Sequence, residues 1–153
     1  MIKDFWKWHE IKSSLEERDN IVYFYEREIW LASFGINLGH EEDGKNERFL
    51  RPVVIMKKFN GDMFWGVPLT STDRSYPHYY PIEINGRKSS LLLLQMRSID
   101  RKRLFRKVGA INEKDFDGAK RRIVELLDIE KQIPSSGGDL QLTSESPEAE
   151  AKV

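Results

Sequence analysis

Six basic residues within eleven positions form the densest cluster of positive charge in the chain. They are Arg97, Arg101, Lys102, Arg103, Arg106 and Lys107, and the single acid among them is Asp100. Such a cluster attracts phosphate groups, and a guanidinium presents a planar fork that matches two oxygens of a phosphate. If the protein binds a polyanion, we expect the binding site to lie near this segment.

The net charge of the whole chain is zero, with 25 basic and 25 acidic residues, but the two kinds are unevenly spread. Four acids and one lysine fall in residues 134–153, so the rest of the chain holds 24 basic and 21 acidic residues. The part expected to fold is therefore mildly basic, which is compatible with a polyanionic partner.

Several other kinds of chemistry are disfavoured by residue type. The three histidines, His9, His40 and His78, are widely spaced and lie in no metal-ligand motif, and cysteine is absent. No glycine-rich phosphate loop follows an expected strand, and no Ser, His and Asp stand in a recognisable catalytic arrangement. We therefore expect neither a metal nor a cofactor.

The sequence indicates a cytoplasmic protein. Its first eight residues contain lysine, aspartate and tryptophan where a signal peptide needs an unbroken apolar stretch, and apolar runs such as Leu91–Leu94 are too short to span a membrane. Because the chain has no cysteine, no disulfide points to an oxidising compartment.

The elements that would position the basic residues are mostly short strands. Seven segments are expected strands, because most are rich in bulky apolar residues and turn signals lie between them: residues 21–25, 28–34, 53–57, 63–69, 81–84, 89–95 and 105–111. Asn60–Asp62 and Asn85–Gly86 predict two hairpins, the second with a type I′ turn. Residues 35–50, which contain three glycines and three consecutive acids, predict a long loop.

A helix is expected at each end of this β-rich region. Between Asp4 and Arg18, one helical face is predicted from the spacing of Phe5, Trp8, Ile11 and Leu15. Asn112 and Asp115 resemble the N-cap pair of a second helix, whose apolar face is Phe116, Ala119, Ile123, Leu126 and Leu127. We predict a mainly β protein of the α+β class, a small closed or half-closed barrel with helices. Its parts are a helical extension (1–20), a barrel domain (21–130) and a disordered tail (131–153).

An ordered succession of features resembles the MazF/PemK toxin family. In order, the features are a tryptophan-containing strand (Glu28–Gly35), a glycine and glutamate loop (Gly39–Gly44), Arg51-Pro52 opening a valine-rich strand, a strand end (Val67–Ser71) and the segment Gln95–Leu104. Each feature alone is weak, but their order over residues 28–127 is specific. The resemblance implies an SH3-like, PemK-type barrel that forms a homodimer, cuts single-stranded RNA at short sequences without a metal, and is held inactive by a cognate antitoxin protein.

The resemblance also assigns catalytic roles to Arg51 and Thr70, which match the family's arginine and its threonine or serine. In metal-free RNA cleavage the ribose 2′-hydroxyl attacks the adjacent phosphate, leaving a cyclic phosphate and a 5′-hydroxyl. A guanidinium and a hydroxyl can stabilise the charged intermediate, whereas arginine is too basic to act as a general base. Taken alone, an arginine at a strand start is usually an exposed charge and a Thr-Ser pair is usually a turn, so both roles rest on the resemblance.

Glu41 falls where the family's loop carries a glutamate, so it is expected either to accept the 2′-hydroxyl proton or to hold Arg51 in place. The sequence departs from the family here, because Glu42 stands at the usual glutamine position and residues 45–50 lengthen the loop. The RNA contacts we expect are from Arg97, Arg101, Arg103, Ser71 and Tyr79, through phosphate binding and base stacking.

Two other functions stay open on the sequence. The same barrel also serves toxins that jam DNA gyrase by protein contact, and the changes around Glu42 leave open an interaction module that has lost activity. An RNA digestion assay separates all three.

Overall fold

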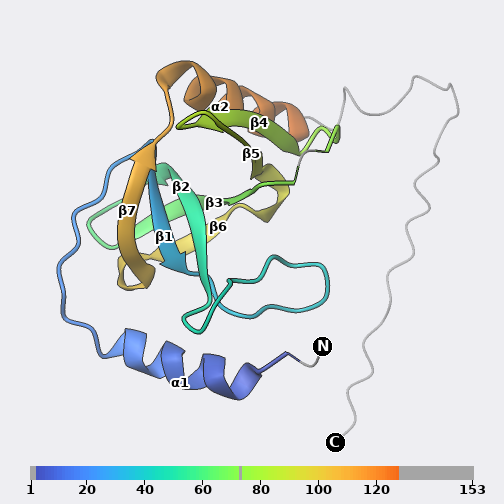
Figure 1. The fold of residues 1–153 in the computed structure, drawn as a ribbon. Helices are drawn as coiled ribbons and strands as arrows, with labels where there is room; N and C mark the ends of the chain where they lie inside the picture. The colour runs from blue at the N-terminus through green and yellow to red at the C-terminus, as the bar shows by residue number, and fades with distance from the viewer. Residues whose placement is uncertain (1–2, 73, 128–153) are drawn as a thin grey trace, which may run out of the picture.

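The computed structural model describes residues 3–72 and 74–127 and shows a curled antiparallel sheet with a helix at each end of the chain (Figure 1). The elements are α1 (Phe5–Glu16), β1 (Glu28–Ser33), β2 (Leu50–Lys58), β3 (Met63–Thr70), β4 (Tyr79–Ile84), β5 (Arg87–Leu92), η1 (Leu93–Gln95), β6 (Arg97–Asp100), η2 (Arg101–Arg103), β7 (Leu104–Ala110) and α2 (Glu113–Leu127). The predicted tail, residues 131–153, lies outside the described residues. Within the described ranges, no helix combines the length and the apolar character that a membrane span needs.

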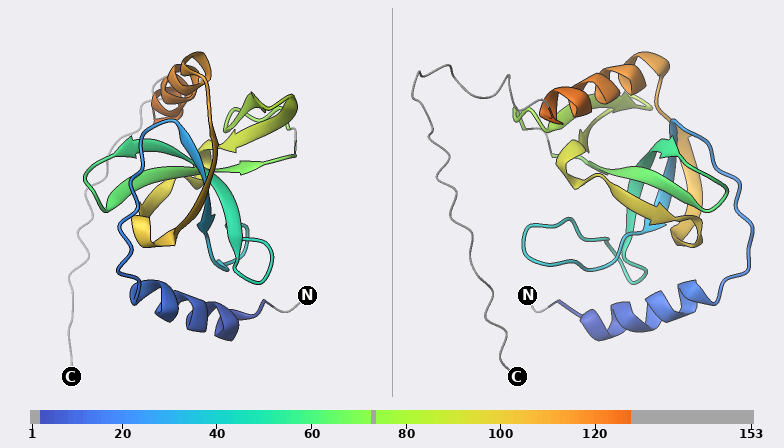
Figure 2. Two further views of the ribbon diagram at one scale, coloured as in Figure 1. Left: turned by 60° about the vertical axis from the view of Figure 1, so that its left-hand side comes forward. Right: turned by 180° about the vertical axis from the view of Figure 1, so that it is seen from behind.

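Strand β3 is the centre of the sheet. The strand order is β4-β5-β3-β2-β1-β7, and β6 pairs with β3 off this path. Strands β6, β3, β2, β1 and β7 curl into a barrel-like body, while the β4–β5 hairpin leans away from it and lies beside α2 (Figure 2). The predicted fold class is confirmed: a mainly β, barrel-like sheet with an N-terminal and a C-terminal helix.

Two hydrophobic clusters stabilise this arrangement, and β2 contributes to both. Val54 and Met56 point into a cluster shared with the β4–β5 hairpin and α2, which includes Leu91 and Phe116. The alternate residues Val53 and Ile55 point into the barrel, together with Phe24, Phe34, Phe64 and Ile99. Because both faces of β2 are buried, its sequence is a continuous apolar run and not an alternating one.

Three expectations about the strands differ from the structure. The strand expected over residues 89–95 ends at Leu92, and Leu93–Gln95 form the 3-10 helix η1. Residues 21–25 were expected to form a strand, but they run extended outside the sheet, with Phe24 buried and Tyr23 and Tyr25 exposed. Buried and exposed side chains therefore alternate in this segment as they do in a strand, but no neighbouring strand pairs with it. Conversely, β6 was not expected, because Ile99 is its single buried side chain; it forms through its pairing with β3, which places Ile99 opposite Phe64.

The predicted N-terminal helix is present as α1, but its apolar face is only partly covered. Leu15 is buried, Trp8 and Ile11 are half-buried, and Phe5 keeps 46% of its surface exposed. The Asp4 side chain accepts a hydrogen bond from the Lys7 backbone N–H at 2.9 Å and so caps the helix. Phe5 belongs to the predicted apolar face but stays exposed, since α1 contacts the barrel mainly through Trp8 and Leu15.

The N-cap of α2 is the predicted pair, and we expect its loss to be measurable. The Asp115 N–H donates to Asn112 Oδ1 at 2.8 Å, and Asn112 Nδ2 donates to Asp115 Oδ2 at 2.6 Å. Asn112→Ala should lower the free energy of unfolding by about 1 kcal/mol in urea denaturation. Lys114→Ala, an exposed change in the same turn, is the matched control. Equal stability of the two variants would show that the cap contributes nothing.

Candidate active site

A groove of about 590 Å³ opens where the ends of β2 and β3 meet the β4–β5 hairpin. Its charged lining residues are Lys45, Arg51 and Arg87, and its polar lining residues are Thr70, Ser71, Asn85 and Ser89. A groove whose charged side chains are all basic and whose other polar groups are hydroxyls and an amide is suited to a phosphate-containing ligand.

Arg51 and Thr70 are brought together by the pairing of two strands. Arg51 is the second residue of β2 and Thr70 is the last residue of β3. The antiparallel register that pairs Val53 with Pro68 carries Arg51 to the level of Thr70, and Arg51 Nη1 donates to the Leu69 carbonyl at 3.1 Å. The Thr70 hydroxyl accepts a hydrogen bond from the Thr72 N–H at 3.2 Å, so its own proton can be donated to a ligand.

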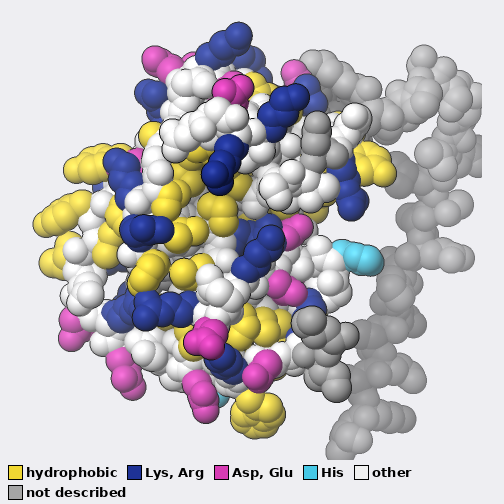
Figure 3. Space-filling model, in the orientation of Figure 1, with side chains coloured by type: hydrophobic (Ala, Val, Ile, Leu, Met, Phe, Trp, Pro, Cys, Tyr) yellow, Lys and Arg dark blue, Asp and Glu magenta, His cyan; other side chains and the backbone are white. Residues whose placement is uncertain are grey.

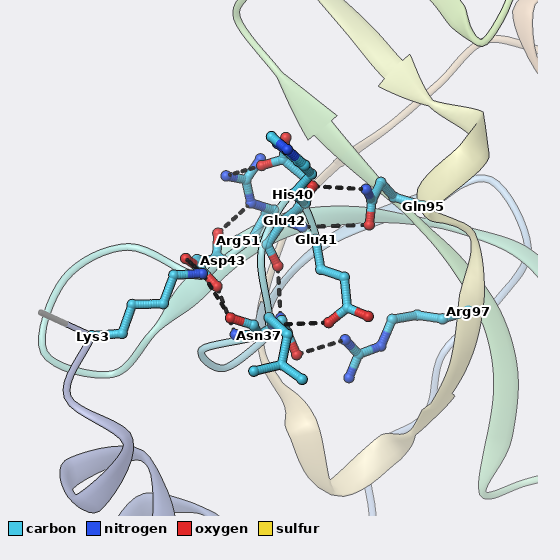
Figure 4. Close-up of polar contacts among 10 residues, drawn as sticks. Lys3, Asn37, His40, Glu41, Glu42, Asp43, Arg51, Gln95 and Arg97 are labelled. Carbon is cyan, nitrogen blue, oxygen red and sulfur yellow. Dashed lines mark hydrogen bonds and ion pairs between the residues drawn. The ribbon is translucent and has the colours of Figure 1, made fainter.

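The loop that connects β1 to β2, residues 34–49, folds over the Arg51 guanidinium. Glu42 Oε2 lies 2.6 Å from Arg51 Nη2, and Arg51 Nε donates to the Asp43 carbonyl at 2.7 Å. Figure 4 shows Arg51 held between these two loop residues, and only 8% of the surface of Arg51 is exposed. A ligand phosphate therefore has to take the place of loop atoms to reach the guanidinium.

This loop is held by hydrogen bonds within it and by Gln95, which is distant in sequence. The Asn37 side chain donates to the Glu42 carbonyl at 2.7 Å, and Gln95 from η1 donates to the His40 carbonyl at 3.3 Å. At the base of the loop, Gly44 N–H donates to the Gly35 carbonyl at 2.7 Å. The loop predicted over residues 35–50 is present, and it has a defined path.

The structure places Glu42, and not Glu41, beside Arg51. Glu41 is exposed, and its Oε2 accepts a hydrogen bond from the Leu38 N–H at 3.0 Å. The expectation that Glu41 could hold Arg51 in place is therefore corrected, since the neighbouring carboxylate forms that ion pair. Glu41 lies instead near Arg97 (Figure 4). Burial lowers the pKa of Arg97, and the negative charge of Glu41 offsets part of that lowering.

The three arginines predicted to bind RNA phosphates do not line the groove. Arg101 pairs with Asp62 at 2.8 Å, Arg97 lies over the Phe34 ring at 4.6 Å, and Arg103 donates to the Ser33 carbonyl at 3.0 Å. Burial, followed by the nearby positive charge of Arg97, lowers the pKa of Arg103. The side chains of this basic run point to different parts of the molecule, and on the face in Figure 3 basic side chains alternate with hydrophobic ones.

Ser71 and Tyr79, the other two predicted RNA contacts, lie in different places. Ser71 is exposed and lines the groove beside Thr70. Tyr79 belongs to an aromatic cluster with His78, at 5.0 Å between ring centroids, and Tyr76, at 6.1 Å. This cluster adjoins a separate hollow of about 340 Å³ that Arg74 and Arg122 also line.

Sequence reasoning missed the other basic and amide side chains of the groove. Asn85 and Arg87 flank the tip of the β4–β5 hairpin, and Lys45 follows the acidic part of the loop. The Asn85-Gly86 turn was predicted, so a basic residue directly after it was the available signal. No group of His, Cys, Asp or Glu suited to hold a metal ion occurs within residues 3–72 and 74–127.

The chain belongs to the family of PemK-like, MazF-like toxins of type II toxin-antitoxin systems, whose sequence model matches residues 25–127. The match covers all the strands and α2, and it begins after α1. A comparison with curated proteins finds none that matches.

Several solved structures share the fold. MazF from Deinococcus radiodurans is 19% identical with a TM-score of 0.53, over 69% of this chain and 98% of that one. The Mycobacterium tuberculosis toxin MazF-mt6 is 18% identical with a TM-score of 0.51, over 67% and 97% of the two chains. An endoribonuclease from a mycobacterial species in complex with its cognate antitoxin is 13% identical with a TM-score of 0.51, over 69% and 95%. At these identities the similarity establishes the fold.

Proposed function

We propose that this toxin-family protein is a metal-independent endoribonuclease that cleaves single-stranded RNA at short sequences. The observation that carries the proposal is that Arg51 and Thr70 come from two strands into one groove whose charged lining is basic. Lys45 and Arg87 line the same groove and supply further positive charge for the phosphates of a bound strand.

The proposed reaction is attack of the ribose 2′-hydroxyl on the adjacent phosphate. Arg51 stabilises the negative charge that develops on the phosphate oxygens and gives a proton to the departing 5′ oxygen, while the Thr70 hydroxyl donates a second hydrogen bond. Glu42, displaced from Arg51 by the phosphate, is the carboxylate that we assign as acceptor of the 2′-hydroxyl proton. The products are a 2′,3′-cyclic phosphate and a 5′-hydroxyl, and we assign no step to Glu41.

Digestion of RNA in the presence of EDTA tests the proposal. The purified protein should cut a long RNA of mixed sequence at the same sites with and without EDTA, and the downstream fragments should carry 5′-hydroxyl ends, which polynucleotide kinase labels without prior phosphatase treatment. Loss of cleavage in EDTA and its recovery with magnesium would contradict the metal-free mechanism. Intact RNA under all conditions would favour a toxin that acts by protein contact.

We also propose that the protein works in the cytoplasm as a homodimer and pairs with a cognate antitoxin protein. The family supports this proposal, as does the mycobacterial endoribonuclease whose structure contains its cognate antitoxin. Light scattering on the purified protein distinguishes a dimer of about twice the 18.0 kDa chain mass from a monomer.

A further inference from the structure

Lys3 contacts both limbs of the loop that covers Arg51. Its Nζ lies 2.8 Å from Asp43 Oδ2 and donates to the Asn37 carbonyl at 2.6 Å. Figure 4 shows the side chain of Lys3 reaching from the start of the chain toward Asp43 and Asn37. A single ammonium group therefore joins the outgoing and returning halves of the loop.

Asp43 connects Lys3 to Arg51 directly. One oxygen of its carboxylate pairs with Lys3 Nζ, and the other accepts a hydrogen bond from the Asn37 N–H at 2.6 Å. Its backbone carbonyl accepts from Arg51 Nε, and the preceding residue, Glu42, pairs with Arg51 Nη2. Movement of Asp43 away from Lys3 therefore also moves the two loop groups that contact the guanidinium.

Helix α1 fixes the position from which Lys3 reaches the loop. The Trp8 ring lies so close to Gly35, at the base of the loop, that a Cβ on Gly35 would come within 2.5 Å of the ring. Trp8 also contacts the Phe49 ring edge to face at 5.8 Å, at the other end of the loop. The helix is held on the barrel by buried Leu15 and by Lys102 Nζ, which donates to the Glu16 carbonyl at 2.6 Å.

The Glu42 carboxylate occupies Arg51 in the way that a phosphate would. Carboxylates and phosphates both bind a guanidinium through charge-assisted hydrogen bonds, so the two groups compete for the same donors. We propose that residues 3–16 act as an intramolecular clasp that keeps the 34–49 loop closed over Arg51 and so restrains RNA cleavage. The effect on cleavage rests on the proposed ribonuclease function, whereas closure of the loop over Arg51 does not. The clasp precedes the family match, which begins at residue 25.

The ion pair between Lys3 and Asp43 is about one-third exposed, with side-chain exposures of 32% and 34%. Exposed pairs of this kind stabilise one conformation only modestly, so removal of Lys3 should shift the opening equilibrium by about two- to fivefold. The clasp is therefore a restraint that thermal motion opens.

Chemical labelling of Arg51 with phenylglyoxal, which reacts with accessible guanidinium groups, measures this opening without RNA. Mass spectrometry of peptides gives the labelling rate of Arg51 relative to exposed Arg87 in the same molecule. Lys3→Ala and Asp43→Asn should each raise this ratio by about two- to fivefold. The labelling ratio of the double variant should exceed that of either single variant only slightly, because the two residues act as a pair. Lys12→Ala, an exposed change on the same helix, should leave the ratio unchanged.

Equal Arg51 labelling in wild type, Lys3→Ala and Asp43→Asn, with the melting temperature unchanged, would overturn the clasp. RNA cleavage by Lys3→Ala should rise by a factor similar to the labelling ratio. Faster labelling of Arg51 with no rise in RNA cleavage would show that the clasp does not restrain activity. If neither wild type nor any variant cuts RNA, the ribonuclease proposal fails, and the labelling rates by themselves decide whether residues 3–16 close the loop over Arg51.

Discussion

Replacing Arg51 with alanine should lower the rate of RNA cleavage by about a hundredfold or more, the scale expected when a preorganised donor to the transition state is lost. The guanidinium is preorganised because the Leu69 carbonyl holds it at the groove wall. Thr70→Ala should cost less, since a neutral hydroxyl stabilises a developing charge less than a cation does. Initial rates on one RNA substrate at saturating concentration give both values.

Matched variants separate loss of chemistry from loss of charge or fold. Arg51→Lys keeps the charge but lacks the planar fork, so it should recover little of the activity. Arg48→Ala removes an exposed arginine that lies over the Phe105 ring outside the groove, and it should cut at nearly the wild-type rate. Because Arg51 is buried and paired with Glu42, a thermal melt must show that each variant is folded. Folded Arg51→Ala and Thr70→Ala that cut at wild-type rates would place the active site elsewhere.

The parts of the fold that were predicted correctly have local signals. The Asn85-Gly86 turn was predicted from its sequence, and both residues have the positive φ that a type I′ turn requires, 50° and 75°. The cap of α2 is likewise encoded within four residues, Asn112 to Asp115. Strand β6 has no such signal, because it exists through its pairing with β3, more than thirty residues earlier in the chain. The composition of a strand does not predict non-local pairing of this kind.

The position of Arg51 and Thr70, the proposed catalytic pair, in one groove could be anticipated from the sequence, but the register of the loop could not. Arg51 and Thr70 stand in strands, where pairing fixes their positions. Which of two adjacent carboxylates reaches Arg51 depends on the path of the 34–49 loop, and that path is fixed by contacts with Lys3 and Gln95, far from it in sequence. A shift of one residue exchanges Glu41 for Glu42. Sequence position alone carries no information about such contacts.

Charge density along the sequence also proved a poor guide to the charge in the groove. The run from Arg97 to Lys107 spans β6, η2 and part of β7, so successive side chains point in different directions. Lys107 pairs with Glu28 at 2.6 Å, and Lys102 and Arg101 have acidic partners on other elements. Most of these basic side chains therefore interact with other parts of the fold. The groove instead takes its basic side chains from three separate segments, at Lys45, Arg51 and Arg87.

Deleting residues 1–18 should lower the melting temperature by roughly 10 °C, because α1 contributes buried surface as well as polar contacts. Burial of Leu15 alone is worth about 1.5–3 kcal/mol, and half-buried Trp8 and Ile11 add to it. Arg18, which donates to the Lys102 carbonyl at 3.3 Å, is lost with the helix. A loss of about 3 kcal/mol is a large share of the stability of a domain this size.

Truncation after residue 133 is the matched comparison, since it removes twenty residues from the other end of the chain. The removed segment has four acids and few apolar side chains. The shortened chain should therefore keep the melting temperature of the full chain and bind RNA slightly more tightly at low salt. The two truncations should therefore differ in thermal melts recorded in one buffer. If both melt like the full chain, then α1 is a loosely attached arm, and the contacts of Trp8 and Leu15 add nothing to the stability of the barrel.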